Sequence, residues 1–546
     1  MLPLLAIPLI FFLVCLVVCL RLSPETAFFA KDQGLTSAVT QTMLSGEIPL
    51  LGPPSHIGGR HLGPLHYWYN GFLLSLSGGD EFHALLIDVF VKLCSAALLI
   101  FVGSAYAQKS ARAWTAVGIS LAMGLGQVIF MYRDAWQPHL LLPTGVLFWW
   151  AVLRFLEKRT QHIMWVLVAG SLCIQVQYAA AILAAPTIVG LLLVRGTSAL
   201  DLKRSLTPCF SLYLAALALF LVWLPSLLYE LWYPSNLRAL FQALIHPLGA
   251  GAQAGFGNSL RNSIAFFSQY ALGAPPLTVK SLVSSWQFWI ALFGTLPCLA
   301  ALLGTKRTPV RFLICQTLIG GLIYTVILSR QPAPLERYFL LSLVPPLIMI
   351  WGLLFGVSVT SLIQSMAQGA GELGKIRRVL AVTGWISSAT LLVFLSFQSY
   401  DRSIKNLMRR PLDPSLSLSA ARYFGTLLAD DPRQKTLLTW GSAKLMDYSY
   451  LYFAGPRYWS AMSQGRELKE LTVFESVPKE SKLGFLIACP IPSRERRKQL
   501  AERLAPQWTI SKWTPCAPAY RCGQCVSAEL EVSKKEAASL VSAPRQ

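Results

Sequence analysis

Charged residues are scarce in this chain, and that scarcity decides its class. Only 13% of the 546 residues are Asp, Glu, Lys or Arg, whereas 54% are hydrophobic, and the mean hydropathy is +0.51. Soluble domains usually carry about 25% charged residues. The composition therefore excludes an ordinary soluble domain and predicts an α-helical polytopic membrane protein.

Acidic residues are scarcer than basic ones, with 26 Asp and Glu against 47 Lys and Arg, which gives a formal charge of +21. Such an excess could indicate nucleic-acid binding. Here, however, the basic residues stand in short clusters between apolar runs, a pattern typical of cytoplasmic loops in membrane proteins. We therefore expect no nucleic-acid partner. The chain also lacks a repeat of fixed period and a low-complexity tract.

The first apolar run, residues 1–20, is long enough to cross a bilayer and lacks the basic start of a signal peptide. We interpret it as a retained helix. The run 163–194 is flanked by basic clusters that both belong in the cytoplasm, so it should enter and return with a turn near Gln177. About eleven crossings are expected, near 1–20, 84–107, 113–130, 140–155, 163–194 (twice), 209–228, 286–303, 312–328, 338–358 and 379–397.

Two charged residues stand inside the second predicted helix. Asp88 and Lys92 are four residues apart, so they share a helix face and can form an ion pair within the membrane. A structural pair is the favoured interpretation, and a proton relay is the alternative.

The predicted topology divides the chain into two domains. Residues 1–398 form the membrane domain, with large extracytoplasmic loops at 21–82 and 225–285, and residues 399–546 form a small extracytoplasmic α/β domain. Strands are expected at 435–440 and 482–488, and a helix at 493–504. The protein is expected in the cytoplasmic (inner) membrane with its C-terminal domain outside the cytoplasm.

Four of the eleven cysteines lie in that last domain: Cys489, Cys516, Cys522 and Cys525. The other seven are scattered through apolar segments, where cysteine behaves as a small hydrophobic residue. The spacing Cys522-Gly-Gln-Cys525 fits a zinc knuckle, a redox pair or a disulfide. Disulfides are favoured because the domain is predicted to face an oxidising compartment.

The first extracytoplasmic loop carries the most distinctive residues. Asp32 follows the first apolar run within a dozen residues, and the loop continues through Gly63-Pro64-Leu65-His66-Tyr67-Trp68. An acid at this place is a candidate reactive carboxylate. The alternative is that Asp32 caps a short interfacial helix beginning at Gln33.

These features together resemble the GT-C superfamily of polyprenyl-phosphate-sugar-dependent glycosyltransferases. The branch it resembles includes the protein mannosyltransferases, the lipid A aminoarabinose transferase and the RgtA/B/C/D-like enzymes. The resemblance rests on the acid after helix one and covers roughly residues 1–400. The other matching motifs are Gly63–Trp68, Arg133…Trp136-Gln137-Pro138, Gln175-Val-Gln177, Arg337-Tyr338 and Pro345-Pro346.

The resemblance implies a role for each matching residue. Asp32 would be the general base, although it is followed by Gln33 where members of the family often have a second, adjacent acid. Asp134 would be the acid that the family often places after helix three. The donor phosphate would be bound by Arg337, Arg330, Arg60 and Lys31, and the sugar or acceptor pocket would include His66, Tyr67, Trp68, Trp136 and Gln177. Basic residues and aromatics also populate membrane interfaces without binding a substrate, and that alternative stays open.

No metal and no cofactor are expected, because the spacing of His56, His61 and His66 fits no familiar ligand pattern. The expected partners are a polyprenyl-phosphate-linked sugar donor, an envelope lipid, glycan or protein acceptor, and membrane lipids. Three other functions remain open. An envelope glycan polymerase or ligase is the main one, a non-catalytic scaffold is another, and a transporter is disfavoured because no paired repeats are found.

Overall fold

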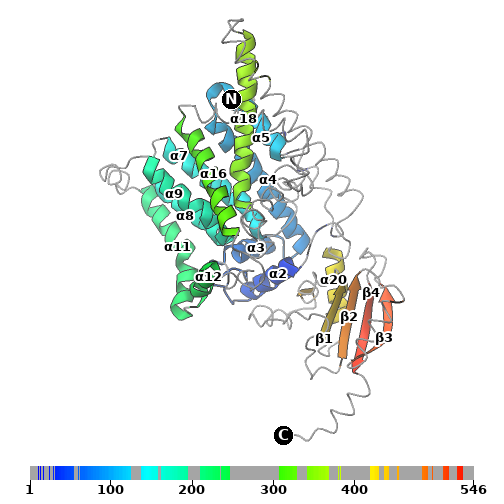
Figure 1. Ribbon diagram of the computed structural model, residues 1–546. Coiled ribbons are helices and arrows are strands. Elements are labelled where there is room, and N and C mark those ends of the chain that lie inside the picture. Colours follow the sequence, from blue (N-terminus) through cyan, green and yellow to red (C-terminus); the bar gives the residue numbers. More distant parts are fainter. Residues whose placement is uncertain are drawn as a thin grey trace. The chain divides into compact units, whose positions relative to one another are not determined.

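The computed structural model in Figure 1 describes most of the first half of the chain and selected elements of the second half. The described residues are 31–53, 60, 62–123, 137–157, 162–194, 210–233, 235–245, 307–328, 341–367, 418–429, 436–441, 452–453, 483–489, 508–515 and 526–532, with a few single residues elsewhere. The chain forms two compact units. The helical unit contains Met1–Leu20, Leu50–His66 and Ile87–Lys405, and the composite unit contains Arg21–Pro49, Tyr67–Leu86 and Asn406–Gln546.

The helical unit is built from apolar helices joined by short 3-10 turns. Its described helices are α4 (Glu81–Tyr106, whose first residues belong to the composite unit), α5 (Arg112–Met123), α7 (Leu141–Leu156), α8 (Ile163–Val176), α9 (Ala181–Val194), α11 (Phe210–Trp232), α12 (Asn236–Ile245), α16 (Thr308–Leu328) and α18 (Val344–Ala367). The 3-10 turns are η1 (Lys109–Ala111), η2 (Gln137–Leu140), η4 (Tyr178–Ala180) and η5 (Leu341–Leu343).

Among the described residues, four helices are long and apolar enough to cross a membrane: 81–106, 137–156, 212–232 and 344–364. Three shorter apolar helices accompany them at 163–176, 178–194 and 308–324. The protein is thus a multi-pass membrane protein. The predicted helices at 1–20, 286–303 and 379–397 lie outside the described residues, apart from isolated positions.

Helices α5 and α18 pack against each other at glycine (Figure 1). A Cβ placed on Gly118 would lie 3.1 Å from the Cα of Gly352, and one on Gly352 would lie 2.9 Å from the carbonyl oxygen of Thr115. Neither position has room for a side chain, so the two backbones meet directly. Such close contacts compensate for the weak hydrophobic driving force between helices in lipid.

The predicted reversal at Gln177 is confirmed. Helix α8 ends at Val176, Gln177 has an extended backbone, and α9 begins at Ala181 after the short turn η4. A Cβ on Gly170 would lie 3.7 Å from the Cβ of Ala184, although a continuous helix would separate those residues by about 21 Å. The two helices therefore fold back on one another.

Two predicted boundaries are wrong. Helix α11 continues through Pro225 to Trp232, so the external loop expected from residue 225 begins later. A proline removes one helical hydrogen bond without always ending a helix in a membrane protein. The helix expected at 338–358 continues to Ala367. Its described part begins with the 3-10 turn η5 and is α-helical from Val344, with Pro345 and Pro346 in the first turn, where proline is well tolerated.

The expected ion pair within α4 is also confirmed. The Nζ atom of Lys92 lies 2.6 Å from the Oδ2 atom of Asp88, and both side chains are almost completely buried, at 1% and 3% exposure. Two buried charges of opposite sign compensate each other's loss of hydration. The pair is therefore a fixed structural element of α4.

Replacing Lys92 with Met is expected to lower the free energy of unfolding by about 3–5 kcal/mol, because the Asp88 carboxylate then stays buried without its cation. The double variant Asp88→Leu, Lys92→Met should recover most of that loss, since neither charge remains. Chemical unfolding of the detergent-solubilised protein measures both. A single variant within 1 kcal/mol of the wild type would show that the pair does not stabilise the fold.

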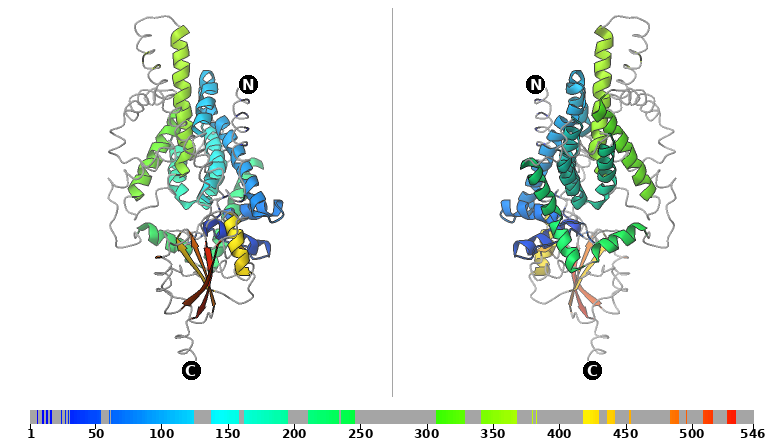
Figure 2. Two further views of the ribbon diagram at one scale, coloured as in Figure 1. Left: turned by 90° about the vertical axis from the view of Figure 1, so that its right-hand side faces the viewer. Right: turned by 90° about the vertical axis from the view of Figure 1, so that its left-hand side faces the viewer.

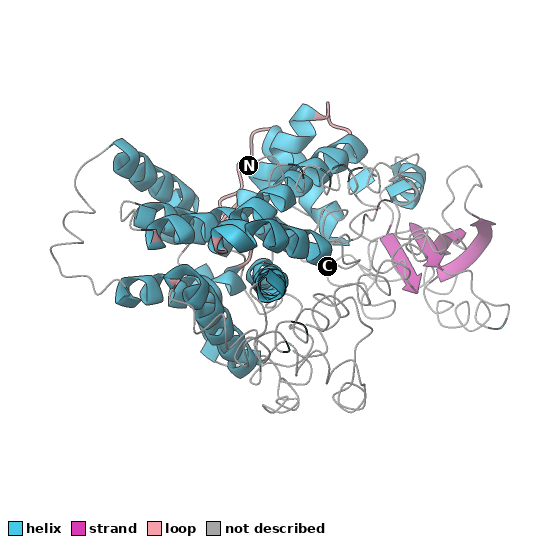
Figure 3. Cartoon of the chain, turned by 90° about the horizontal axis from the view of Figure 1, so that it is seen from above, coloured by secondary structure: helices cyan, strands magenta, loops and turns pink. Residues whose placement is uncertain are grey.

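The composite unit contains the helices α2 (Lys31–Leu44), α3 (Leu65–Leu76, from Tyr67 onward) and α20 (Leu418–Ala429). It also contains one four-stranded sheet, whose twist is visible in Figure 2 and whose strands are magenta in Figure 3. The strands are β1 (Thr436–Gly441), β2 (Leu483–Cys489), β3 (Trp508–Pro515) and β4 (Val526–Val532), in the order β1-β2-β4-β3.

Strand β1 is parallel to β2, while β4 is antiparallel to both β2 and β3. The two strands predicted from short apolar runs correspond to β1 and β2, and Leu486 and Ile487 of β2 are fully buried. The sequence pattern did not predict β3 and β4. Strand β4 alternates apolar and polar residues along its whole length, a strand signal that the sequence analysis missed. In β3 the alternation is interrupted where the register between Ile510 and Trp513 is irregular, which weakens the signal.

Candidate functional site

Asp32 lies in the first turn of α2, and its side chain is exposed. The helix begins at Lys31 and not at Gln33, so Asp32 stands inside the helix and is not its N-cap. A carboxylate in the first turn is stabilised by the helix dipole and by the N–H groups at that end. This location leaves the carboxylate accessible, as a general base requires.

The rest of α2 is polar and nevertheless buried. Five of its polar side chains are less than one-tenth exposed: Gln33, Thr36, Ser37, Thr40 and Thr42. Burying a polar group is costly unless it forms hydrogen bonds. Some of these bonds are local, such as that from the Thr42 hydroxyl to the Ala38 carbonyl at 3.0 Å. Others connect α2 to distant parts of the composite unit.

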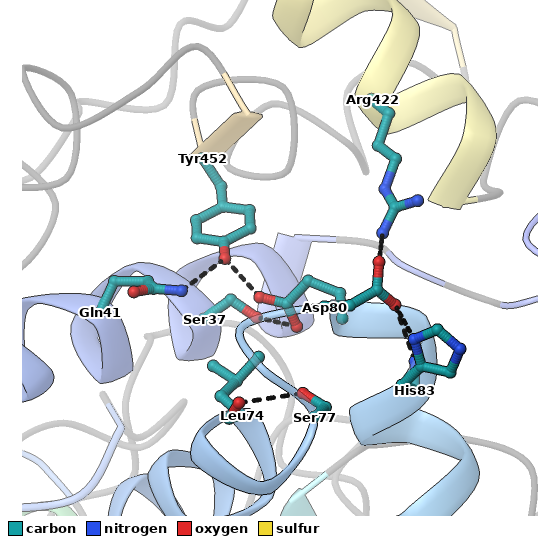
Figure 4. Close-up of polar contacts among 9 residues, drawn as sticks. Ser37, Gln41, Leu74, Ser77, Asp80, His83, Arg422 and Tyr452 are labelled. Atoms are coloured by element: carbon teal, nitrogen blue, oxygen red, sulfur yellow. Dashed lines mark hydrogen bonds and ion pairs between the residues drawn. The ribbon is translucent and has the colours of Figure 1, made fainter.

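The principal connection centres on Glu81, the first residue of α4, and its partners Ser37 and Tyr452 are labelled in Figure 4. The Ser37 hydroxyl of α2 donates to Oε2 of Glu81 at 3.0 Å, and the Tyr452 hydroxyl donates to Oε1 of the same carboxylate. The amide of Gln41 donates to the Tyr452 oxygen at 3.3 Å. Residues from three distant segments are thus joined around one buried carboxylate, and we name Ser37, Gln41, Glu81 and Tyr452 the Glu81 network.

The environment of Tyr452 keeps its hydroxyl protonated. Burial, followed by the neighbouring Glu81 carboxylate, raises the pKa of Tyr452 well above its ordinary value. The phenol therefore remains a hydrogen-bond donor at physiological pH, as the contact with Glu81 requires. Its ring packs on Phe29 and Phe453, with centroid distances of 6.1 and 4.8 Å.

Asp80 forms a second polar group beside the Glu81 network. Its carboxylate accepts the backbone N–H of His83 at 2.9 Å, which makes Asp80 the N-cap of α4, and it lies 3.0 Å from a guanidinium nitrogen of Arg422 in α20. Partial burial raises the pKa of Asp80, but the His83 N–H and the Arg422 guanidinium together lower it further, so the pKa lies below its ordinary value.

The segment before α2 is fastened to α20 as well. The backbone N–H groups of Leu418 and Ser419 donate to the carbonyl oxygens of Ala27 and Pro24, at 3.0 and 3.2 Å. The first N–H groups of a helix have no partner within the helix, and these two bonds satisfy a pair of them. Phe29 adds a ring contact with Phe453 at 5.5 Å.

Asp80→Asn should lower stability near neutral pH by about 0–1 kcal/mol, since asparagine keeps the helix cap but loses the half-exposed ion pair with Arg422. The pKa of Asp80 is lower in the folded protein than in the unfolded chain. Its contribution is therefore present above pH about 4 and is lost as the pH falls through the folded pKa. Thermal unfolding of both proteins from pH 7 to 3 should show curves that converge in acid, and a difference independent of pH would contradict the assignment.

In the helical unit, Arg60 is tied to α12. The Arg60 backbone N–H donates to Oδ1 of Asn236 at 2.6 Å, and the Asn236 amide donates back to the Arg60 carbonyl at 3.1 Å. The Nε atom of Arg60 donates to the Gly52 carbonyl at 2.9 Å. The main chain and side chain of this predicted phosphate-binding residue are therefore both held in place.

The motif that begins at Gly63 lies against the last turn of α8 and against α11. Gly63 has no room for a Cβ because the Gln175 side chain fills that place, and the Ser226 hydroxyl of α11 donates to the carbonyl of Leu62. His66 is buried at the start of α3. Gln177 is also buried, and its side-chain oxygen has no hydrogen-bond partner among the described residues.

The two aromatic residues after His66 differ in exposure. Tyr67 is fully buried, whereas Trp68 is 38% exposed. Of these two rings, Trp68 is the one that can stack on a ligand in this conformation. The other predicted site residues Asp134, Trp136, Arg330, Arg337, Cys516, Cys522 and Cys525 lie outside the described residues, as do the side chains of Lys31 and Cys489.

Sequence reasoning did not identify the Glu81 network. The sequence Gly78-Gly79-Asp80, before a long apolar run, carried a recognisable helix-start signal, and both glycines adopt positive φ angles. Ser37 and Gln41, four residues apart on one helix, also share a face. Tyr452 and Arg422 carried no such signal, because only the tertiary structure brings them to Glu81 and Asp80.

Comparison with solved structures identifies the fold. The structure of ArnT from Cupriavidus metallidurans bound to undecaprenyl phosphate has a TM-score of 0.55 and 12% identity, covering 95% of this chain and 97% of that one. The same protein in the apo state gives a TM-score of 0.54 and 13% identity, covering 98% and 97%. AglB, an oligosaccharyltransferase from Archaeoglobus fulgidus, gives 0.42 at 11% identity, covering 88% and 69%, which is too low to establish a common fold.

No protein-family model matches the sequence, and no curated protein sequence is significantly similar to it. The fold is therefore established by the structure and not by sequence identity. The similarity to ArnT extends over nearly the whole of both chains. The chain shares the fold of ArnT, in agreement with the fold that its sequence motifs led us to expect.

Proposed function

We propose that this protein is a membrane glycosyltransferase that moves a sugar from a polyprenyl-phosphate donor to an envelope acceptor on the extracytoplasmic face. The observation that carries the proposal is the fold similarity over 95% of the chain to ArnT, whose structure contains undecaprenyl phosphate. A shared fold does not by itself establish an activity. The exposed acid at the start of α2, in the loop where the motifs predicted a base, supports the same reaction.

In the proposed reaction, the acceptor hydroxyl oxygen attacks the anomeric carbon of the donor sugar. A new carbon–oxygen bond forms while the bond from that carbon to the phosphate oxygen breaks, and polyprenyl phosphate leaves. Asp32 accepts the hydroxyl proton as general base. Asp134 is proposed as the second acid of the site. The acceptor is a lipid, a glycan or a protein of the envelope.

The leaving phosphate requires cations, and the proposed ones are Arg337, Arg330, Arg60 and Lys31. The planar guanidinium group suits a phosphate because it can donate two parallel hydrogen bonds. The described contacts support Arg60 in particular, since its bond to the Gly52 carbonyl already orients the guanidinium group. Trp68 is proposed to stack on the sugar, and His66, Tyr67, Trp136 and Gln177 to line the pocket around it.

Asp32→Asn should lower the turnover number by about 10²–10⁴ while the protein stays folded, because the variant keeps the shape of the side chain but cannot accept the proton. Transfer is measured with the purified protein in liposomes. The donors are a panel of undecaprenyl-phosphate-linked hexoses and pentoses, and the acceptor is envelope extract from cells that lack the gene.

The matched control is Glu47→Gln, which removes an exposed carboxylate of the composite unit shortly after α2. It should transfer at the wild-type rate. Near-normal transfer by a correctly folded Asp32→Asn variant would move the base to Asp134 or elsewhere. Absence of transfer by the wild type from every donor of the panel would contradict the proposed function itself.

The proposed topology places the first loop and the C-terminal segment outside the cytoplasm. A reporter active only outside the cytoplasm should therefore work when it is fused after Tyr400, and a reporter active only inside should work when it is fused near Lys158. This expectation rests on the positions of the basic clusters in the sequence, because such clusters mark cytoplasmic loops. A cytoplasmic C-terminal segment would place Asp32 on the wrong side of the membrane for an extracytoplasmic reaction.

A further inference from the structure

We infer that Tyr452 and α20, both from the C-terminal part of the chain, are positioning elements for the catalytic base, because they fix the chain on both sides of Asp32. This inference rests on the proposed role of Asp32. It assigns a role in catalysis to a part of the chain that lies beyond the motif-bearing region. All the residues concerned belong to the composite unit.

The first set of contacts lies on the C-terminal side of Asp32. Ser37 donates to Glu81 at 3.0 Å, and Tyr452 donates to the other oxygen of the same carboxylate. Gln41, one turn after Ser37, donates to Tyr452 at 3.3 Å. Two successive turns of α2 are thus hydrogen-bonded to the buried pair of Glu81 and Tyr452. These bonds fix both the rotation of the helix and its position along its axis.

The second set lies on the N-terminal side of Asp32. The carbonyl groups of Pro24 and Ala27 accept the first two N–H groups of α20, and Phe29 packs on the rings of Tyr452 and Phe453. The Arg422 guanidinium of α20 lies over the Phe453 ring at 5.7 Å and contacts Asp80 at 3.0 Å. The chain that leads into Asp32 is therefore held by the same C-terminal residues.

Asp32 stands between these two anchored stretches, three residues after Phe29 and five before Ser37. A segment fixed at both ends has little freedom to shift, so the exposed carboxylate of Asp32 keeps one position. Accurate placement matters because a shift of about 1 Å of a reacting group can cost about 10² in rate. Buried polar networks of this kind specify one geometry, which an apolar contact would do less strictly.

Tyr452→Phe tests the inference with the smallest change. It removes one hydroxyl group but keeps the ring contacts with Phe29 and Phe453, so the protein should fold. We expect the turnover number to fall by about tenfold, while the KM for the donor and the affinity for undecaprenyl phosphate stay within about twofold of the wild type. Tyr213→Phe is the matched control, because Tyr213 is 63% exposed on α11, and it should behave as the wild type.

Combination with Asp32→Asn separates positioning from general stability. If Tyr452 acts through Asp32, then Tyr452→Phe should cause no further loss in the Asp32→Asn background, because the base that it positions is already removed. Two losses that multiply would overturn the inference, and so would an unchanged turnover number in the single Tyr452→Phe variant. A fall in thermal stability with turnover unchanged would assign Tyr452 a structural role only.

The same cycle distinguishes failure of the inference from failure of the proposed function. If Asp32→Asn retains full turnover, Asp32 is not the base, and the inference falls together with that assignment. If Asp32→Asn is impaired but Tyr452→Phe is not, the base stands and only the positioning role is lost. Glu81→Gln provides an independent check, since Gln keeps the shape of Glu81 and can still accept a bond from Tyr452. It should therefore lose less turnover than Glu81→Ala.

Discussion

The buried carboxylate of Glu81 is the interaction on which the described part of the composite unit depends. It accepts hydrogen bonds from Ser37 and Tyr452, and these bonds allow the polar helix α2 to be buried. Without them, α2 would have no apolar face strong enough to hold it, because its buried side chains are largely hydroxyl and amide groups. The location of the exposed Asp32 follows from this anchorage.

The composite unit holds α2 by hydrogen bonds between polar side chains. In the helical unit, by contrast, the helices are held together mainly by apolar surface and by close backbone contacts. Direct contact between α5 and α18 at Gly118 and Gly352 and the buried pair of Asp88 with Lys92 are typical of helices within lipid. The fold similarity to ArnT extends over 95% of the chain at only 12% identity.

The sequence predicted the features that depend on local pattern. The basic clusters on both sides of residues 163–194 predicted the turn at Gln177, and the four-residue spacing predicted the Asp88–Lys92 pair. Short apolar runs predicted the strands β1 and β2. The structure contains all of these features. The Glu81 network could not be predicted in this way, because Ser37, Glu81 and Tyr452 are far apart in sequence. The buried state of Tyr67 and the exposure of Trp68 likewise depend on tertiary packing, which single-sequence patterns do not encode.

The proposed reaction is the transfer of a sugar from a lipid phosphate. Its most direct test is the mass of the products formed by the purified wild-type protein in liposomes that contain undecaprenyl-phosphate-linked sugars and envelope extract. Transfer should yield free undecaprenyl phosphate together with an acceptor heavier by one sugar residue, in equal amounts. Donors that stay intact, or that only cross the bilayer without losing their sugar, would contradict it.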